Sequence, residues 1–266
     1  MAIDIDRPLP PPSAHDTVKA IVADAKRAEV PIRLEFLQQL KGDGSPIPGP
    51  LAEFMKAGDR RGLVLWMMLL TKASGDDFGV TLAATVWARA MGFDLPDSKS
   101  ARTAISKTWT RLERRGLITR KRVHRKTCVT LLREDGSRRP YGHTPGSARE
   151  RYLRLPHAFW LSGPATSSRW YQVLSLPEIA MLLVARTMGN EFRLPTESVP
   201  DWYGISADSA NRGFHGLEAH GLLSIEKYYK EAPLTPQGYT AENRYTLQPP
   251  FGPMPVKQSP RRKDRR

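Results

Sequence analysis

Two matching segments decide the fold of this chain: Leu112-Glu113-Arg114-Arg115-Gly116-Leu117-Ile118 and, 105 residues later, Leu217-Glu218-Ala219-His220-Gly221-Leu222-Leu223. In both segments a helical pattern of apolar residues ends at a glycine that is followed by a leucine. Glycine is enriched just past helix ends because it adopts the left-handed conformation at no steric cost. Each segment is therefore predicted to hold the end of a helix and the beginning of a strand.

The repeat extends to both sides of these segments. In each copy we expect a short apolar strand, a strongly apolar helix, a short helix closed by glycine, the helix closed by Gly-Leu, and two strands. The first copy has these as Ile32-Arg33-Leu34, Met68-Leu69-Leu70, Thr81 to Gly92, Ile118 to Val123 and Thr127 to Leu132. The second has Tyr152-Leu153-Arg154-Leu155, Met181-Leu182-Leu183, Thr196 to Gly204, Leu223 to Tyr229 and, after a long loop, Asn243 to Gln248.

This order of elements resembles the winged helix-turn-helix family, over residues 81–132 and 196–247. In that family the second helix of the motif lies in the major groove of DNA, and the hairpin, or wing, contacts the backbone or the minor groove. The resemblance implies a mainly α fold with small β-hairpins (α+β), arranged as two tandem winged-helix domains with disordered termini.

The predicted domain boundaries follow turn-rich and proline-rich breaks in the pattern. They are a flexible N-terminal segment over 1–29 in which a short helix can form, a first winged-helix domain over 30–135, a linker over 136–150, a second winged-helix domain over 151–251, and a basic disordered tail over 252–266.

Positive charge is concentrated in the first copy. The whole chain has a formal net charge of +14, and from Lys99 to Lys126 it has eleven Lys and Arg against one acid, Glu113. Cations at this density repel one another unless a polyanion is near, and a phosphate backbone supplies one. The segment therefore favours a polyanionic partner over an ordinary solvated surface.

Helical spacing separates a core face from a binding face in this segment. Ala101, Ile105, Trp109 and Leu112 are expected in the core. The opposite face of Ser, Thr, Lys and Arg suits hydrogen bonding to bases and phosphates. With the wing, it gives the predicted DNA-binding residues Lys99, Ser100, Arg102, Thr103, Ser106, Lys107, Thr110, Arg111, Arg114, Arg120, Lys121, Arg122, His124, Arg125 and Lys126.

The second copy keeps the pattern without the charge. Ala210, Phe214 and Leu217 are its expected core residues. Asn211, Arg212 and His215 occupy the binding-face positions and are included among the predicted DNA contacts, yet residues 206–230 hold three basic and three acidic residues. Two roles fit this copy equally: weak base contacts once the first copy is bound, or contact with a second copy of the chain or another protein.

Other chemistry is not indicated. Cys128 is the only cysteine, so an intramolecular disulfide is excluded, and no metal-ligand spacing, Walker-type loop or nucleophile elbow is present. We expect no enzyme activity, no cofactor and no metal. The apolar run from Gly62 to Leu70 is too short to span a bilayer, so no membrane partner is expected, and a cytoplasmic, nucleoid-associated location is predicted.

These features predict a protein that binds double-stranded DNA, similar to plasmid-type replication initiators. The strand before each first helix, together with the lack of an effector-pocket signature in the sequence, favours the initiator type. A transcriptional regulator with duplicated winged helices is the first alternative. A protein-interaction module, in which the second domain binds a partner, is the other.

Overall fold

The computed structural model describes residues 10–73, 77–123, 126–142 and 151–253. These residues form a mixed α+β fold with small antiparallel sheets, which confirms the predicted α+β class, while the tandem winged-helix arrangement stays a prediction. The disorder predicted for the two termini concerns mainly residues 1–9 and 254–266, which lie outside the described ranges.

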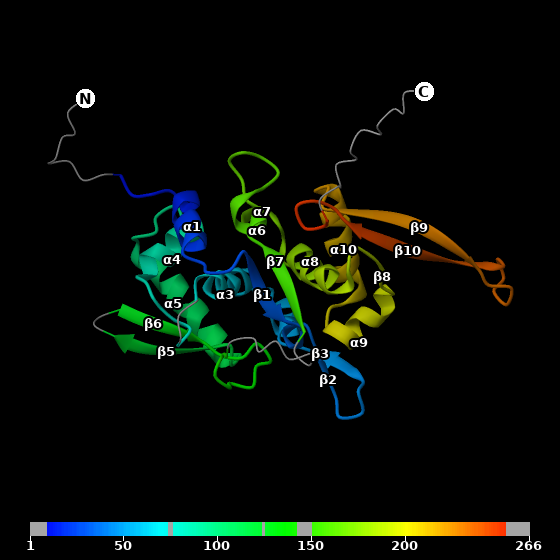
Figure 1. Ribbon diagram of the computed structural model, residues 1–266, viewed down its shortest axis with the longest axis horizontal. Helices are drawn as coiled ribbons and strands as arrows, with labels where there is room; N and C mark the ends of the chain where they lie inside the picture. The colour runs from blue at the N-terminus through cyan, green and yellow to red at the C-terminus, as the bar shows by residue number, and fades with distance from the viewer. Residues whose placement is uncertain (1–9, 74–76, 124–125, 143–150, 254–266) are drawn as a thin grey trace, which may run out of the picture.

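Most of the first copy lies in one half of the elongated molecule, and its short hairpin of residues 38–48 lies beside the second copy (Figure 1). Its elements are α1 (Ala14–Ala23), β1 (Glu29–Arg33), the 3-10 turn η1 (Leu34–Phe36), β2 (Gln38–Leu40), β3 (Pro46–Pro48), α2 (Leu51–Lys56), α3 (Arg60–Lys72), β4 (Gly79–Thr81), α4 (Ala84–Ala90), α5 (Lys99–Arg114), β5 (Ile118–Val123) and β6 (Lys126–Leu131).

The second copy occupies the other half. Its elements are β7 (Tyr152–Pro156), α6 (Ala158–Leu161), α7 (Trp170–Val173), α8 (Leu176–Met188), β8 (Glu191–Arg193), the 3-10 turn η2 (Thr196–Ser198), α9 (Val199–Tyr203), α10 (Ala207–Ala219), β9 (Leu223–Glu231) and β10 (Tyr239–Leu247).

Each copy has a three-stranded sheet with the same topology. The strand order is β4-β6-β5 in the first copy and β8-β10-β9 in the second, so the last strand lies in the middle of each sheet. The predicted order of elements lacked β4 and β8. Both strands are three residues long, too short for alternation in the sequence to reveal them.

The two hairpins differ in length. β5 and β6 pair from Ile118↔Leu131 to Val123↔Lys126, close to the predicted strands. The predicted long loop between 230 and 242 was wrong, because β9 continues to Glu231 and β10 begins at Tyr239. The Ala232 amide donates to the Gly238 carbonyl at 2.8 Å, which closes the turn over residues 232–238 that contains Pro233 and Pro236.

The cores of both copies form around the predicted helix faces. Ala101, Ile105, Trp109 and Leu112 of α5 are buried, and so are Ala210, Phe214 and Leu217 of α10, which confirms both predicted core faces. Residues 63–69 of α3 and 179–185 of α8 are at most 1% exposed. These two helices are covered on all sides, which explains their continuous apolar sequences.

The opening strands of the two copies pair with each other. β1 and β7 are antiparallel, and Ile32 lies opposite Leu153. These two residues occupy equivalent positions in the repeated Ile32-Arg33-Leu34 and Leu153-Arg154-Leu155. An antiparallel pair of equivalent strands has a local two-fold axis, which here passes between Ile32 and Leu153. Figure 1 shows β1 and β7 near the middle of the molecule.

Further contacts across this axis are reciprocal. The Tyr171 hydroxyl on α7 donates to the Ala90 carbonyl at the end of α4, at 3.0 Å. In the opposite direction, the Gln38 amide on β2 donates to the Trp202 carbonyl in α9, at 3.4 Å, and α9 packs against β3. Each copy therefore contacts a short helix of the other, α4 in one direction and α9 in the other, and these contacts help to hold the two copies together.

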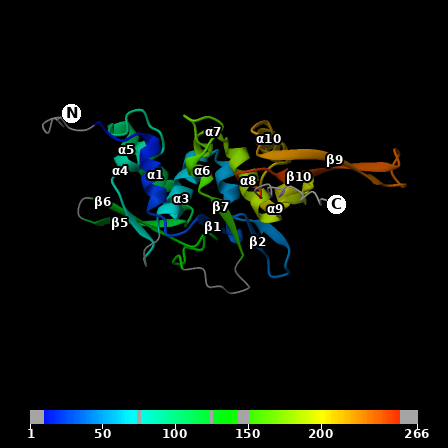
Figure 2. The ribbon, with the colours of Figure 1, turned by 45° about the horizontal axis from the view of Figure 1, so that its top comes forward.

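Segments expected outside the domains belong to this folded body. Helix α1 begins with a capping box at Ser13 and buries Val18, Ile21 and Val22. It packs against α4 and α6, and both views place it beside the first copy (Figures 1 and 2). In the part of the expected linker that the structure describes, residues 136–142, Tyr141 is buried at 7% exposure, whereas residues 137–140 and Gly142 are exposed.

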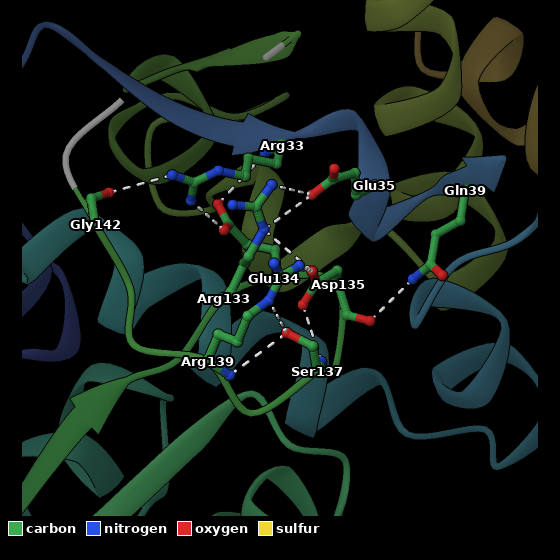
Figure 3. Close-up of polar contacts among 9 residues, drawn as sticks. All are labelled: Arg33, Glu35, Gln39, Arg133, Glu134, Asp135, Ser137, Arg139 and Gly142. Carbon is green, nitrogen blue, oxygen red and sulfur yellow. Dashed lines mark hydrogen bonds and ion pairs between the residues drawn. The ribbon is translucent and has the colours of Figure 1, made fainter. Parts of the chain in front are cut away.

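A network of ion pairs holds the chain after β6 against β1 (Figure 3). Arg33, 3% exposed, contacts the Glu134 carboxylate at 2.5 Å, and Glu134 is fully buried. Arg133 donates to Glu35 at 2.8 Å, and Asp135 accepts from Arg139 at 2.7 Å. Because β1 also pairs with β7, this network connects the first hairpin to the axis between the copies.

Candidate nucleic-acid interface

Helix α5 is fixed to α3 by a buried carboxylate. Ser98 caps the start of α5, and Asp59 caps the start of α3 by accepting from the Gly62 amide at 3.0 Å. Asp59 also accepts from Arg111 at 2.8 Å and from Arg115 at 2.6 Å. One carboxylate therefore sets the position of α5 relative to the rest of the core.

The surroundings of Asp59 favour its charged form. Burial alone would raise the pKa of this carboxyl group, but the hydrogen bonds from Arg111, Arg115 and the Gly62 amide outweigh it and lower the pKa to about 2. Asp59 is therefore ionised at neutral pH. Arg111 was predicted as a DNA contact. Its guanidinium instead pairs with Asp59 and helps to position α5.

A second ion pair connects the first hairpin to α5. Arg120 on β5 donates to the Glu113 carboxylate at 2.6 Å and to the Thr110 hydroxyl at 3.2 Å. The Thr110 hydroxyl in turn donates to the Ser106 carbonyl, at 3.1 Å. Arg120 and Thr110 thus align the hairpin with the helix, and the one acid of α5 is neutralised by this contact.

The remaining basic side chains in this region point to solvent. Among the residues that the structure describes, they are exposed and form no ion pair; they are Lys99, Arg102, Lys107, Arg114, Lys121, Arg122 and Lys126. Ser100, Thr103 and Ser106 lie exposed among those on the helix. His124 and Arg125, also predicted as contacts, lie outside the described residues.

The sequence analysis missed one arginine next to this face. Arg61 on α3 is exposed, and its guanidinium lies 5.0 Å from the centre of the Phe93 ring. It borders an open groove of about 450 Å³ whose other walls include Lys99, Thr103 and Lys107. Arg61 is remote in sequence from α5, and no pattern within α3 indicates that it reaches the groove.

The two faces of the first hairpin differ in their relation to α5. Side chains alternate between the faces of a strand, so Arg120 and Arg122 share one face and Lys121 lies on the other. The Arg120 contacts show that its face is the one next to the helix. Arg122 therefore extends the basic face of α5, while Lys121 provides a matched cation on the opposite side.

The equivalent surface of the second copy is compensated. Asn211, Arg212 and His215 are exposed on α10, as expected for its binding face. Arg212 pairs with Asp208 at 3.1 Å, and His215 lies 3.4 Å from Glu218. The predicted contacts of this copy are thus brought to one surface, where neighbouring acids offset the basic side chains.

Counting charges over equivalent elements gives a clear contrast. Helix α5 has five basic residues and one acid, and β5 with β6 adds four basic residues and no acid. Helix α10 has one basic residue and two acids, while β9 with β10 has three of each. The basic surface is therefore a property of one copy.

No group of His, Cys, Asp or Glu that could hold a metal ion occurs in the described ranges. Helices long and apolar enough to cross a membrane are also missing from the part of the chain that the structure describes. Comparisons of the chain with protein-family models, with curated proteins and with solved structures find no match.

Proposed function

We propose that this protein binds double-stranded DNA, with α5 in the major groove and the β5–β6 hairpin against the backbone. The observation that carries the proposal is the exposed, unpaired set of cations that α5 and this hairpin present together. An α-helix fits the major groove, and unpaired Lys and Arg gain affinity by replacing the counterions condensed on DNA.

The proposal treats the two copies as tandem winged-helix domains. Each has a helix, a strand, two helices and a hairpin in that order, and each second helix exposes polar side chains opposite its buried face. The pairing of β1 with β7 supports a rigid unit in which both copies are held in a fixed arrangement. Because the two copies are related by a local two-fold axis, the protein suits two adjacent DNA half-sites in inverted orientation. The two half-sites would differ in sequence, because α5 and α10 expose different side chains.

Single alanine variants test the DNA-binding face. Lys107→Ala and Arg122→Ala should each weaken binding of a short duplex by about tenfold at moderate salt, since each removes a cation from the face. Lys121→Ala, which removes the same charge from the far face of the hairpin, should cost clearly less. The proposal fails if Lys107→Ala and Arg122→Ala leave duplex binding in fluorescence anisotropy unchanged.

For the biological role we propose initiation of replication of the plasmid type. The rigid arrangement of the two copies supports this role, since one chain could bind two adjacent half-sites without a second chain. An initiator should protect direct repeats near its own gene in a footprint and support replication of an otherwise inert plasmid. A transcriptional regulator, the alternative, should protect a promoter and change transcript level without supporting replication.

A protein-interaction role, in place of a DNA contact, is the alternative for the second copy alone. Its compensated α10 surface and its neutral hairpin favour contact with protein over electrostatic attraction to DNA. Substituting Arg212 and Lys227 with alanine should leave duplex affinity within about twofold of wild type, because neither belongs to an uncompensated basic face.

A further inference from the structure

The β9–β10 hairpin forms an arm that projects from the second copy (Figures 1 and 2). Every residue from Glu226 to Glu231 is exposed, and Leu234 at the turn is 101% exposed. Two contacts stiffen the arm: Tyr228 lies 4.5 Å from the guanidinium of Arg193, and its neighbour Tyr229 packs edge-on against Tyr239. The arm has no net charge, so phosphate does not attract it.

β9 lies at the edge of its sheet and has only β10 as a neighbour. The Gln248 amide donates to the Leu222 carbonyl, and the Ala232 amide donates to the Gly238 carbonyl. Hydrogen-bonded pairs alternate along an antiparallel ladder, so the even-numbered residues of β9 bond to β10. The amides and carbonyls of Ile225, Lys227, Tyr229 and Glu231 therefore face outward, available to another strand.

The sequence of this edge is complementary to itself in one antiparallel register. Placing Tyr228 opposite Tyr228 of another β9 pairs residues 225–231 of both strands and aligns their outward groups. Glu226 then lies opposite Lys230, and by symmetry Lys230 lies opposite Glu226. Both are non-hydrogen-bonded positions, where facing side chains approach most closely.

Other registers that align the outward groups are poorer. A slide of two residues in one direction lengthens the ladder but places Lys227 opposite Lys227. The same slide in the other direction leaves only residues 227–231 of each strand in the ladder. It places Lys227 opposite Glu231, but at hydrogen-bonded positions, where facing side chains lie farther apart. The free edge of β10, residues 239–243, has a single charged residue, Glu242, and cannot form reciprocal ion pairs.

We propose that the protein self-associates through this edge, with β9 of one copy antiparallel to β9 of a second and Tyr228 on the two-fold axis. The self-complementary charges select a second copy of this chain over an unrelated strand, whose register nothing would fix. The β8-β10-β9 sheets of the two chains then join into one sheet, and the β9–β10 arms hold the two chains together. This association does not depend on DNA binding.

Charge reversal tests both the partner and the register. Glu226→Lys places Lys opposite Lys twice, and Lys230→Glu places Glu opposite Glu twice. Each variant alone should raise the dimer dissociation constant by about tenfold or more in sedimentation velocity at low salt. An equimolar mixture of the two variants should recover wild-type association. In the mixed dimer the two substituted side chains face each other with opposite charge, and the unchanged Lys230 of one variant faces the unchanged Glu226 of the other.

Three results would overturn the proposal: a wild-type chain that stays monomeric over the accessible concentrations, single variants that associate as wild type does, or a mixture that fails to recover. Circular dichroism of each variant shows whether it is folded, and the recovery of association on mixing cannot come from two unfolded chains. Duplex binding by the same variants should be unchanged. A failure of the self-association proposal can therefore be told apart from a failure of the DNA-binding proposal.

Discussion

Helices α5 and α10 occupy equivalent positions in two copies of the same fold, yet only α5 carries uncompensated charge. Both helices begin with a serine cap, bury the same apolar face and end at a Gly-Leu pair. The acids Asp208 and Glu218 face the basic and imidazole groups of α10, whereas the single acid of α5 is bound by Arg120. The fold therefore does not require the basic surface, and its presence on one copy is the observation on which the proposed DNA binding rests.

The chain after each hairpin is also held in two different ways. In the first copy, Glu134 pairs with Arg33 in the interior. In the second copy, Phe251 lies four residues after β10 and is fully buried against Phe159 and Trp170. A buried ion pair tolerates the loss of one partner poorly, since the other charge is then left without compensation.

The largest expected effect is on stability. Glu134→Ala should lower the free energy of unfolding by about 3–5 kcal/mol, because it removes the buried carboxylate that pairs with Arg33. The matched control is Glu242→Ala, which breaks the exposed Arg193–Glu242 pair of the second copy and should cost less than about 1 kcal/mol. Urea denaturation measures both, and equal losses would contradict the difference between the two pairs.

Acid stability should depend on the first copy through Asp59. Its pKa is lowered to about 2 in the folded protein, so its ionised form stabilises the fold above the unfolded pKa, and this contribution is lost as pH falls from about 4 toward 2. Asp59→Asn keeps a helix-capping side chain but should remove about 2 kcal/mol at neutral pH. The difference in the free energy of unfolding between Asp59→Asn and wild type should become smaller as the pH falls. A difference that stays constant from pH 7 to pH 2 would contradict this role of Asp59.

A smaller effect is expected from making the second copy resemble the first. Asp208→Lys removes the acid that pairs with Arg212 and adds a cation to the exposed face of α10. Duplex affinity at low salt should rise by about threefold, with most of the gain lost at high salt through screening. If duplex affinity does not change, α10 does not face DNA in the complex.

The sequence analysis was most accurate where the pattern was long. Core and surface positions follow helical spacing over the sixteen residues of α5, so its four apolar core residues and its exposed cations were predicted, apart from Arg111, which pairs with Asp59. The Gly-Leu pairs located the strands that follow, since Gly116 and Gly221 both adopt a positive φ. The three-residue strands β4 and β8 are defined by hydrogen bonds to distant partners and leave no local signal.

What the sequence could not reveal are contacts between residues far apart in the chain. Nothing local indicates that Asp59 holds Arg111, or that Arg61 lies beside Lys107. The pairing of β1 with β7 likewise joins segments that the repeat shows to be equivalent but not adjacent. The prolines of the second hairpin led to the prediction of a long loop where the structure has paired strands. They lie in the turn of the hairpin and do not interrupt its strands.

The salt dependence of duplex binding tests the central claim most directly. Each phosphate contact contributes about 0.9 to the slope of log affinity against log salt concentration, so losing two contacts should make the slope shallower by about 2. We predict this change for the double variant Lys107→Ala with Arg122→Ala, and an unchanged slope for Arg212→Ala with Lys227→Ala. Equal slopes for both double variants would contradict the assignment of DNA binding to the first copy.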